Sequence, residues 1–349
     1  MKNIDPILQS DLDHIAATFP HWEELAGKAV FITGATGLVG SMLVRTLCAA
    51  PVEIRVIAHV RNEQKARAMF GSLPVSYCVG DVTAPVEYEG AVDHILHTAS
   101  VTASKAFVTQ PVETLMTAID GTRNLLEFAR RKKVRSMVYV SSMEAYGITD
   151  PALERVTEKD LGCIDILSVR SSYSEGKRIC ECLCAAYASE YGVPVKIARL
   201  AQTFGAGVSI SDGRVFAQFT KACLAGTDIV LHTQGKSMGN YCYTADAVRG
   251  LLTVLLKGET ANAYTVVNPA TSMPIRDVAK LVSGTLTGGR TRIIFDIPES
   301  ALTYGYAPDV TMKLSADKLM ALGWKPEVEL PEMFRRLAES FRLQRGDAQ

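Results

Sequence analysis

The chain has 349 residues, of which 48% are hydrophobic and 21% are charged, which is typical of a globular protein with a large core. Lys and Arg together number 37, and so do Asp and Glu, so the chain lacks the overall basic charge of a nucleic-acid-binding protein. Its apolar runs, such as residues 250–256, are far too short to span a bilayer, so we expect no membrane segment.

Residues 1–26 are acidic and amphipathic, and they contain no apolar segment of the kind that secretory signals have. We therefore predict a helical extension that packs on the rest of the protein. The eight cysteines lie scattered through apolar stretches, which is typical of reduced thiols in the cytoplasm. On a helix, Cys180 and Cys184 would share a face and Cys182 would point away, so we interpret the first two as core residues and predict no metal site.

Residues 29–33, with the sequence AVFIT, predict a buried strand, which is followed by a glycine-rich turn over 34–40 and by a helical pattern. Strand, turn and helix in this order are the context that a dinucleotide fingerprint requires. Gly34 would allow the tight turn, Gly37 the approach of a pyrophosphate to the helix N-terminus, and Gly40 the packing of helix on strand. The alternative is an ordinary strand-to-helix turn. The predicted cofactor contacts in this turn are Gly34, Thr36, Gly37, Leu38, Val39 and Gly40.

The second predicted strand, residues 54–60, is followed by Arg61 rather than by an acidic residue. An acid at this point would bind the ribose 2′-hydroxyl of NAD, whereas a guanidinium can accept the 2′-phosphate of NADP. A solvated or helix-capping arginine is the alternative interpretation of Arg61.

Strand-like and helical segments alternate as far as about residue 200. This order predicts an α/β fold, namely a doubly wound parallel sheet of Rossmann type with a smaller C-terminal α/β substrate-binding cap. We assign residues 27–200 to the dinucleotide-binding domain, with a return segment at about 238–267, and residues 201–237 and 268–349 to the cap. The cleft between the cap and the carboxyl ends of the strands is the expected ligand site.

The run of residues 170–178, RSSYSEGKR, places Tyr173 and Lys177 four residues apart, on one face of a helix. A lysine ammonium beside a phenol lowers the pKa of the phenol, so Tyr173 can take a proton from an alcohol while hydride leaves the same carbon. Alone, this spacing is a weak signal, because a surface lysine beside a core tyrosine gives the same pattern. Its place after the glycine-rich turn and after a strand that ends at Ser142 makes the combination specific.

With the spacing G-x-x-G-x-x-G at 34–40 and Y-x-x-x-K at 173–177, the chain resembles the extended short-chain dehydrogenase/reductase family of NAD-dependent epimerases and dehydratases. The resemblance extends from about Gly27 to about Pro326. It implies a Rossmann domain, a nicotinamide cofactor, often a nucleotide-sugar substrate, and a homodimer formed through the helices that include the Y-x-x-x-K segment. Members that recycle their own cofactor mostly use NAD, so the resemblance favours NAD while Arg61 favours NADP.

The resemblance also implies roles for individual residues. Ser142 would hydrogen-bond the reacting oxygen and share its proton with Tyr173, and Lys177 would bind the nicotinamide ribose and keep Tyr173 acidic. Asp81 would cap the adenine amino group, and a turn acid is the alternative for it. The further cofactor contacts, at the ends of the third and fourth strands, are Val82, Thr98 and Ala99.

Position 144 discriminates between reactions within the family. In its 4,6-dehydratases an Asp-Glu pair follows the Ser or Thr, whereas this chain has Met143 and Glu144, so a thioether replaces the acid and plain dehydration is disfavoured. UDP-glucuronate decarboxylases share this Glu without the Asp, and they also resemble the chain at residues 170–178 and 212–215. In the second run Arg214 is a candidate nucleotide or phosphate contact. The alternatives are a solvated Glu144 and a surface Arg214.

Several positions depart from the family pattern. Ala118 and Gln202 stand where the family usually has Asn, and Gly239 stands where it usually has a diphosphate-binding Arg, with Lys236 close enough to substitute. The late Arg of the family is also absent around residues 306–309. Losing both guanidinium forks weakens the case for a standard UDP- or dTDP-sugar. The predicted substrate contacts are Gln202, Arg214 and Lys236.

The sequence as a whole predicts a cytoplasmic, NAD(P)-dependent enzyme that oxidises C4 of a nucleotide sugar transiently and then epimerises or decarboxylates it. The predicted catalytic residues are Ser142, Tyr173, Lys177 and Glu144. One alternative is an NADPH-dependent reductase of a keto-sugar or other ketone, which Arg61 and the missing arginine forks favour. The other is a non-catalytic dinucleotide-binding sensor, against which the intact Ser-Tyr-Lys set argues.

Overall fold

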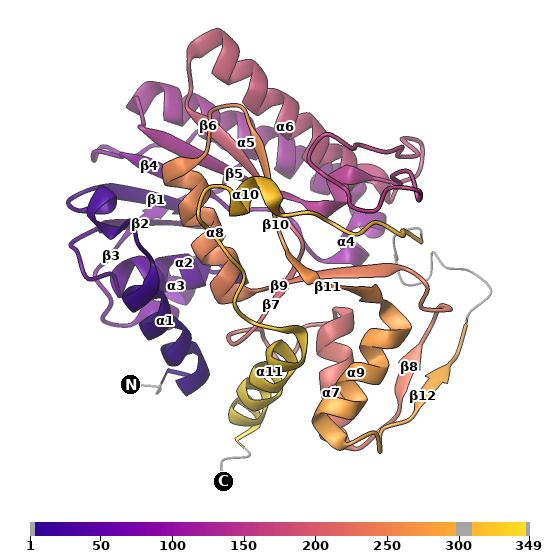
Figure 1. Cartoon of the computed structure of the whole chain (residues 1–349). Coiled ribbons are helices and arrows are strands. Elements are labelled where there is room, and N and C mark those ends of the chain that lie inside the picture. The colour runs from indigo at the N-terminus through magenta and orange to yellow at the C-terminus, as the bar shows by residue number, and fades with distance from the viewer. Residues whose placement is uncertain (1–3, 298–308, 347–349) are drawn as a thin grey trace.

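Within residues 4–297 and 309–346, which the computed structural model describes, seven parallel strands form the largest sheet (Figure 1), and this confirms the predicted α/β fold class. In spatial order the strands are β10 (Ala263–Val266), β6 (Val195–Leu200), β5 (Ser136–Ser142), β4 (His94–His97), β1 (Ala29–Thr33), β2 (Arg55–Val60) and β3 (Val75–Val79). The order along the chain reverses between β4 and β1. This reversal creates the switch point at which open α/β sheets bind their ligands, beyond the carboxyl ends of the strands.

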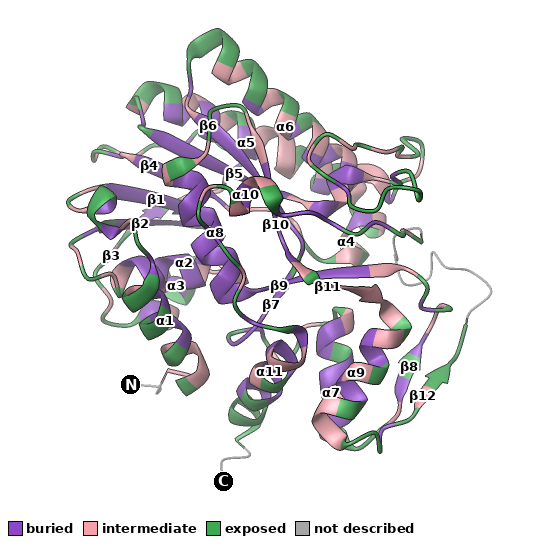
Figure 2. Ribbon diagram, viewed as in Figure 1, coloured by how far each residue is buried: buried purple, intermediate pink, exposed green. Residues whose placement is uncertain are grey.

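Helices cover both faces of this sheet, so its inner strands are buried on both sides, whereas most residues of the edge strand β3 are exposed or half-buried. Alternate residues of β1 enter two different cores: Val30 and Ile32 join one, and Ala29 and Phe31 join the other. Among the helices packed in the first core are α2 (Leu38–Cys48), α3 (Glu63–Phe70) and α8 (Thr244–Lys257). Those in the second are α5 (Pro111–Lys132) and α6 (Ser171–Tyr191). Figure 2 shows the strands of the sheet as buried and the outer faces of α5 and α6 as exposed.

A smaller unit built on a mixed sheet lies beside the large one (Figure 1). Its strands are β7 (Gln202–Phe204), β9 (Met238–Tyr243) and β11 (Asn268–Pro274), with β9 in the middle, parallel to β7 and antiparallel to β11. The other elements of this unit are α7 (Val215–Ala225), β8 (Ile229–Leu231), α9 (Ile275–Thr287), β12 (Ile293–Phe295) and α11 (Leu330–Arg345). Of the predicted return segment, α8 and β10 rejoin the large sheet, whereas β9 pairs within the small one. The domain division given above stays a prediction.

Four short elements complete the chain within the described residues. They are η1 (Trp22–Leu25), α4 (Ser104–Thr109), η2 (Met143–Tyr146) and α10 (Asp317–Met320). Of these, η2 directly continues β5 and α4 lies beside α5 and α6, so both stand next to the predicted Ser142 and Tyr173.

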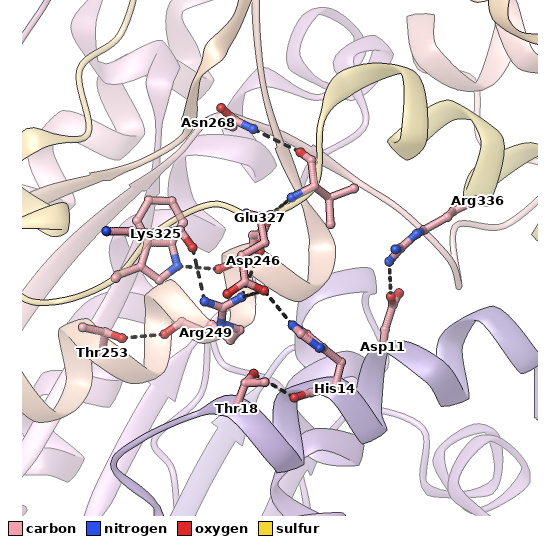
Figure 3. Close-up of polar contacts among 12 residues, drawn as sticks. Asp11, His14, Thr18, Asp246, Arg249, Thr253, Asn268, Lys325, Glu327 and Arg336 are labelled. Carbon is pink, nitrogen blue, oxygen red and sulfur yellow. Dashed lines mark hydrogen bonds and ion pairs between the residues drawn. The ribbon is translucent and has the colours of Figure 1, made fainter.

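The N-terminal residues form a helix, α1 (Pro6–Thr18), which contacts α2 and α8 of the large unit and α11 of the small one. Asp11 of this helix is buried, and its carboxylate accepts hydrogen bonds from the Tyr243 hydroxyl at 2.6 Å and from Arg336 at 2.8 Å. His14 lies 2.6 Å from Glu327, which also pairs with Arg249 (Figure 3). The N-terminal extension therefore contacts residues near the C-terminal end of the chain.

Cys180 and Cys184 are buried in the second core while Cys182 is exposed, as predicted. In the part of the chain that the structure describes, no group of three or more His, Cys, Asp and Glu side chains is arranged to hold a metal ion. No helix within those same residues is long and apolar enough to cross a membrane.

Candidate active site

The glycine-rich turn connects β1 to α2 at the switch point of the sheet. Gly34 has a φ of +64°, and a Cβ there would lie 2.7 Å from the Ala99 amide nitrogen. A Cβ on Gly40 would lie 2.2 Å from the Gly34 carbonyl oxygen. Only glycine fits these two positions, because the first needs the left-handed backbone region and both sit against neighbouring backbone. The turn therefore packs closely against the residues that follow β4.

The N-terminus of α2 is open to an anion. Gly37 is the N-cap residue, it is exposed, and no side chain caps the helix. The first backbone N–H groups of α2 therefore have no side-chain acceptor, and the positive end of the helix dipole points out of the turn. Thr36, Leu38 and Val39 lie half-buried around it. This cradle fits the pyrophosphate of a dinucleotide in the way a helix N-terminus binds phosphate.

The other predicted cofactor residues lie at the same edge of the sheet. The Thr98 hydroxyl donates to the Thr33 carbonyl at 2.7 Å, and the Ala99 amide donates to the Thr33 hydroxyl at 3.2 Å, so both residues lie against the glycine-rich turn. Asp81 and Val82 follow β3. Val82 is buried, and its carbonyl accepts a hydrogen bond from Asn124 at 2.9 Å.

Arg61 stands at the end of β2, with its side chain 81% exposed and a guanidinium nitrogen 3.7 Å from the Asp81 carboxylate. Asp81 also accepts hydrogen bonds from the amide and the hydroxyl of Thr83, and these bonds, the amide first, together with the nearby Arg61, lower the pKa of the Asp81 carboxyl. The exposed guanidinium lies where an adenosine ribose is expected.

Ser142, Tyr173 and Lys177 come together at the carboxyl end of β5. The Ser142 side chain lies close enough to the Tyr173 phenol to lower its pKa. The Lys177 ammonium donates to the Val140 carbonyl at 2.8 Å and lies 5.7 Å from the centre of the Tyr173 ring. Because β5 neighbours β4, this group shares the sheet edge of the glycine-rich turn.

Burial dominates the proton affinities of this pair. It raises the pKa of Tyr173 to about 12, helped by the charge of Glu144 and opposed by Ser142, Arg170 and Arg214. Burial also lowers the pKa of Lys177 to about 8. Burial therefore favours the neutral phenol, and the Lys177 ammonium donates to a backbone carbonyl, so the acidic Tyr173 stays a prediction.

Glu144 lies in η2 and is held by an ion pair rather than solvated. The Arg170 guanidinium approaches both carboxylate oxygens at 2.9 Å, and the Ser174 hydroxyl donates to the carboxylate at 3.1 Å. The same guanidinium lies 4.7 Å from the centre of the Phe107 ring, which stacks on Tyr173 with 4.2 Å between ring centres. Sequence reasoning missed Phe107, because an isolated aromatic residue in a short helix carries no motif.

The three predicted substrate residues have different surroundings. Arg214, at the start of α7, forms a two-pronged ion pair with Asp212, and its charge reaches Tyr173. Gln202 is exposed on β7. Lys236 is exposed and forms no ion pair with any residue in the described ranges. Only Arg214 is thus tied to the catalytic group by an electrostatic contact.

The departures from the family pattern have structural counterparts. A Cβ on Gly239 would lie 2.5 Å from the Tyr241 hydroxyl, so the Tyr241 ring fills the space over position 239. Ala118 faces Gly176 across the α5–α6 contact. Asp309 accepts a hydrogen bond from Ser237 at 2.6 Å, while residues 306–308 lie outside the described residues.

Comparison with known sequences decides the family. The sequence profile of the NAD dependent epimerase/dehydratase family matches residues 30–269. The chain belongs to this family. UDP-glucuronic acid decarboxylase 1 of Danio rerio is 31% identical over 320 residues, which are 90% of this chain and 72% of the relative. UDP-glucuronic acid decarboxylase 6 of Arabidopsis thaliana is 29% identical over 91% of this chain and 90% of its own length.

Solved structures of the family share the fold. UDP-glucose 4-epimerase of Thermotoga maritima, solved with UDP-glucose, has a TM-score of 0.77 and 21% identity, and the match covers 90% of this chain and 99% of the epimerase. The dTDP-glucose 4,6-dehydratase of Streptomyces venezuelae, solved with NAD, has a TM-score of 0.75 and 23% identity, over 92% of this chain and 99% of the dehydratase. At these identities the likeness concerns the fold alone.

Proposed function

We propose that the protein is an NAD(P)-dependent enzyme that oxidises a nucleotide sugar transiently at C4 and completes an epimerisation or a decarboxylation. The observation that carries the proposal is the meeting of Ser142, Tyr173 and Lys177 at the same sheet edge as the glycine cradle. The family and the NAD-bound structures of its members support NAD as the cofactor.

The predicted cofactor-binding residues would each hold a different part of the dinucleotide. The turn at Gly34 and the N-terminus of α2 would hold the pyrophosphate, and Lys177 would hold the nicotinamide ribose. A bound nicotinamide would take the hydride from the sugar carbon and return it. The cradle fits such a cofactor because its glycines leave no side chain between backbone and ligand.

Tyr173 would take the proton of the reacting hydroxyl while Ser142 holds the oxygen. A phenol whose pKa is about 12 is protonated at neutral pH, so its pKa must fall when the ligands bind. Positive charge placed near the phenol by Lys177, Arg170 and Arg214 would favour that fall, and more strongly once substrate has excluded water.

The sugar class follows from Glu144, Met143 and the relatives. A thioether at 143 cannot protonate a leaving hydroxyl, which disfavours dehydration. The relatives compared above are named UDP-glucuronic acid decarboxylases. A nucleotide-linked uronic acid, whose carboxylate is lost from a 4-keto intermediate, is therefore the substrate class that we favour. The Tyr241 ring over position 239 limits the room for a standard diphosphate contact there.

A homodimer through α5 and α6 accompanies the proposal. Both helices carry exposed apolar side chains, among them Val112, Met116, Ile179 and Tyr191. Burying such side chains against a second copy would be favourable. Sedimentation of the purified protein at the mass of one chain would contradict it.

Replacing Tyr173 by Phe tests the proton role. The variant should bind dinucleotide as the native chain does, but its turnover of UDP-glucuronate should fall about 10²- to 10⁴-fold, because the base is lost while the ring stack remains. Tyr191→Phe, on the exposed end of the same helix, is the matched control and should keep its activity. A Tyr173→Phe protein with native turnover would refute the mechanism.

A second function has one specific observation in its favour. The exposed Arg61 guanidinium at the end of β2 would suit the 2′-phosphate of NADP, as in an NADPH-dependent reductase of a keto-sugar or ketone. Such a reductase consumes one reduced cofactor per product, whereas a self-recycling enzyme shows no net change in the absorbance of reduced nicotinamide. That stoichiometry separates the two.

A further inference from the structure

Tyr173 is half-buried, and it is contacted by side chains from several elements that form one continuous chain of contacts. The Phe107 ring lies parallel to the Tyr173 ring, with 4.2 Å between centres and 9° between planes. The Arg170 guanidinium lies 4.7 Å from the centre of the Phe107 ring and forms an ion pair with both carboxylate oxygens of Glu144. Tyr173, Phe107, Arg170 and Glu144 therefore form one assembly, here called the arginine stack.

We propose that Arg170 is a positioning residue, which fixes the ring of Tyr173 through Phe107 and sets the proton affinity of Tyr173 by neutralising Glu144. The expected effect on catalysis rests on the proposed function, whereas the expected effect on the position and titration of Tyr173 does not. The arginine stack joins α4, η2 and the start of α6 around the phenol.

Packing supports the first half of the proposal. Phe107 is buried, and its backbone carbonyl accepts a hydrogen bond from the Ser172 hydroxyl at 3.1 Å, so α4 is fastened to the residue before Tyr173. A parallel aromatic neighbour at this distance limits the tilt of a ring. A guanidinium over the other aromatic ring adds a cation–π attraction, which is stronger in a desolvated site.

Charge supports the second half. Arg170 is buried and Glu144 is partly buried, so their two-pronged pair acts in a medium that screens weakly. Glu144 raises the pKa of Tyr173 and Arg170 lowers it. Taking Arg170 away would leave the negative charge of Glu144 uncompensated beside the phenol. The pair also occupies both carboxylate oxygens, so Glu144 is poorly placed to exchange protons with a substrate.

Other charged groups around the phenol complete its environment. Lys177 lies on the same helix, one turn along, and Arg214 reaches the phenol from the start of α7. The centre of the Tyr139 ring on β5 lies 5.0 Å from the Lys177 ammonium. Within the described residues, none of these three forms a hydrogen bond or ion pair with Glu144, so substitutions at positions 144 and 170 leave the bonds of Lys177 and Arg214 in place.

The test uses a fluorinated tyrosine placed at position 173 of the full chain, because its phenol titrates at lower pH than tyrosine and fluorine NMR follows it without any substrate. Arg170→Met should raise the titration midpoint by about one pH unit, since a nearby cation is lost. Glu144→Gln should lower it. The double variant should return to the native midpoint or below, because both charges are gone.

Two results would overturn the proposal. One is a midpoint that Arg170→Met leaves unchanged, and the other is a double variant that keeps the raised midpoint of Arg170→Met. Replacing both partners of a buried ion pair by neutral residues is often tolerated, so the double variant keeps the test open if Arg170→Met folds poorly. Arg178→Met, which removes bonds to the carbonyls of Ala145 and Gly162 from the same helix, is the control for lost packing and should not move the midpoint.

The stacking half has its own readout. Phe107→Leu should shift the fluorine signal toward that of the free amino acid, because the ring current of the stacked neighbour is lost. In the natural chain, the same substitution should lower kcat about 10²-fold with little change in KM, as expected when a reacting group is misplaced. An unmoved fluorine signal would refute the stack. Inactivity of the native chain with every nucleotide sugar would refute the proposed function and leave the fluorine result standing.

Discussion

At the scale of single residues, the protein keeps its candidate base in an environment that opposes ionisation. Burial alone accounts for the direction of the Tyr173 shift, and the neighbouring Glu144 adds to it. The favourable contacts, from Ser142, Arg170 and Arg214, are individually smaller. A phenol in this environment stays protonated at neutral pH, and perturbed pKa values of this kind are common at functional sites.

Arg61 gives a prediction at this scale. Arg61→Ala should weaken NADPH binding about tenfold while NADH binding changes little, because only the 2′-phosphate would lose a charge-assisted hydrogen bond. Fluorescence titration of both reduced dinucleotides measures the ratio. Arg67→Ala, an exposed arginine on α3 that pairs with Glu63, is the control. An unchanged ratio of the NADPH and NADH affinities would show that Arg61 does not contact the 2′-phosphate.

The residues that carried motifs could be predicted, and those defined only by contact could not. The Y-x-x-x-K spacing and the glycine-rich turn identified Tyr173, Lys177 and Gly34, because helix periodicity and backbone freedom depend on local sequence. Phe107 reaches Tyr173 from a segment 66 positions earlier in the printed sequence, and no local rule predicts that encounter. The direction of the pKa shift of Tyr173 could not be predicted from the sequence either, because burial is a property of the folded chain.

At the scale of elements, the join between β1 and α2 is the tightest part of the candidate cofactor site. The Gly40 position has no room for a side chain, since a Cβ would press on the Gly34 carbonyl at 2.2 Å. The helix must approach this closely for its N-terminus to face the cradle.

Gly40→Ala should therefore lower the free energy of unfolding by about 2–3 kcal/mol, the usual cost of overpacking, and should weaken dinucleotide binding as α2 shifts. Chemical denaturation measures the first effect and a dinucleotide titration the second. Gly284→Ala in α9 is the control, because a Cβ there meets nothing within 4 Å, and it should stabilise the protein slightly. Equal behaviour of the two variants would contradict the packing argument.

The alternation of strands and helices predicted the large sheet well, and it failed where pairing partners are distant in sequence. We predicted that residues 238–267 return to the dinucleotide-binding domain, but β9, at the start of this segment, pairs with β7 and β11. The short η2 and α4 were not foreseen either, because a single turn of helix has too few residues for a periodic pattern.

At the scale of the whole molecule, α1 packs against α2 and α8 of the large unit, and its Asp11 bonds two residues of the small unit, Tyr243 at the end of β9 and Arg336 on α11 (Figure 3 labels Asp11 and Arg336). Burial raises the pKa of Asp11 to about 6, against the opposing bonds to Tyr243 and Arg336. Because the pKa of Asp11 in the folded chain lies above the ordinary value of an aspartic acid, which is about 3.8, Asp11 contributes stability at low pH that is lost as the pH rises through about 6.

Comparison with Asp11→Asn isolates this contribution, since Asn keeps the shape but does not titrate. The free energy of unfolding of the native chain relative to Asp11→Asn should fall by about 2–3 kcal/mol between about pH 4 and about pH 7. Urea denaturation at the two pH values measures it. A difference that stays constant with pH would mean that Asp11 titrates alike in the folded and unfolded chains.

The central claim is that the site at Tyr173 oxidises a sugar carbon and then gives the hydride back. Rapid mixing of the NAD-loaded protein with UDP-glucuronate, followed by the absorbance of reduced nicotinamide, tests it most directly. We predict that the absorbance rises and returns to its starting value as product forms, and that Tyr173→Phe shows no rise. Product formed without any rise in absorbance, or with a rise that does not return to its starting value, would contradict the account.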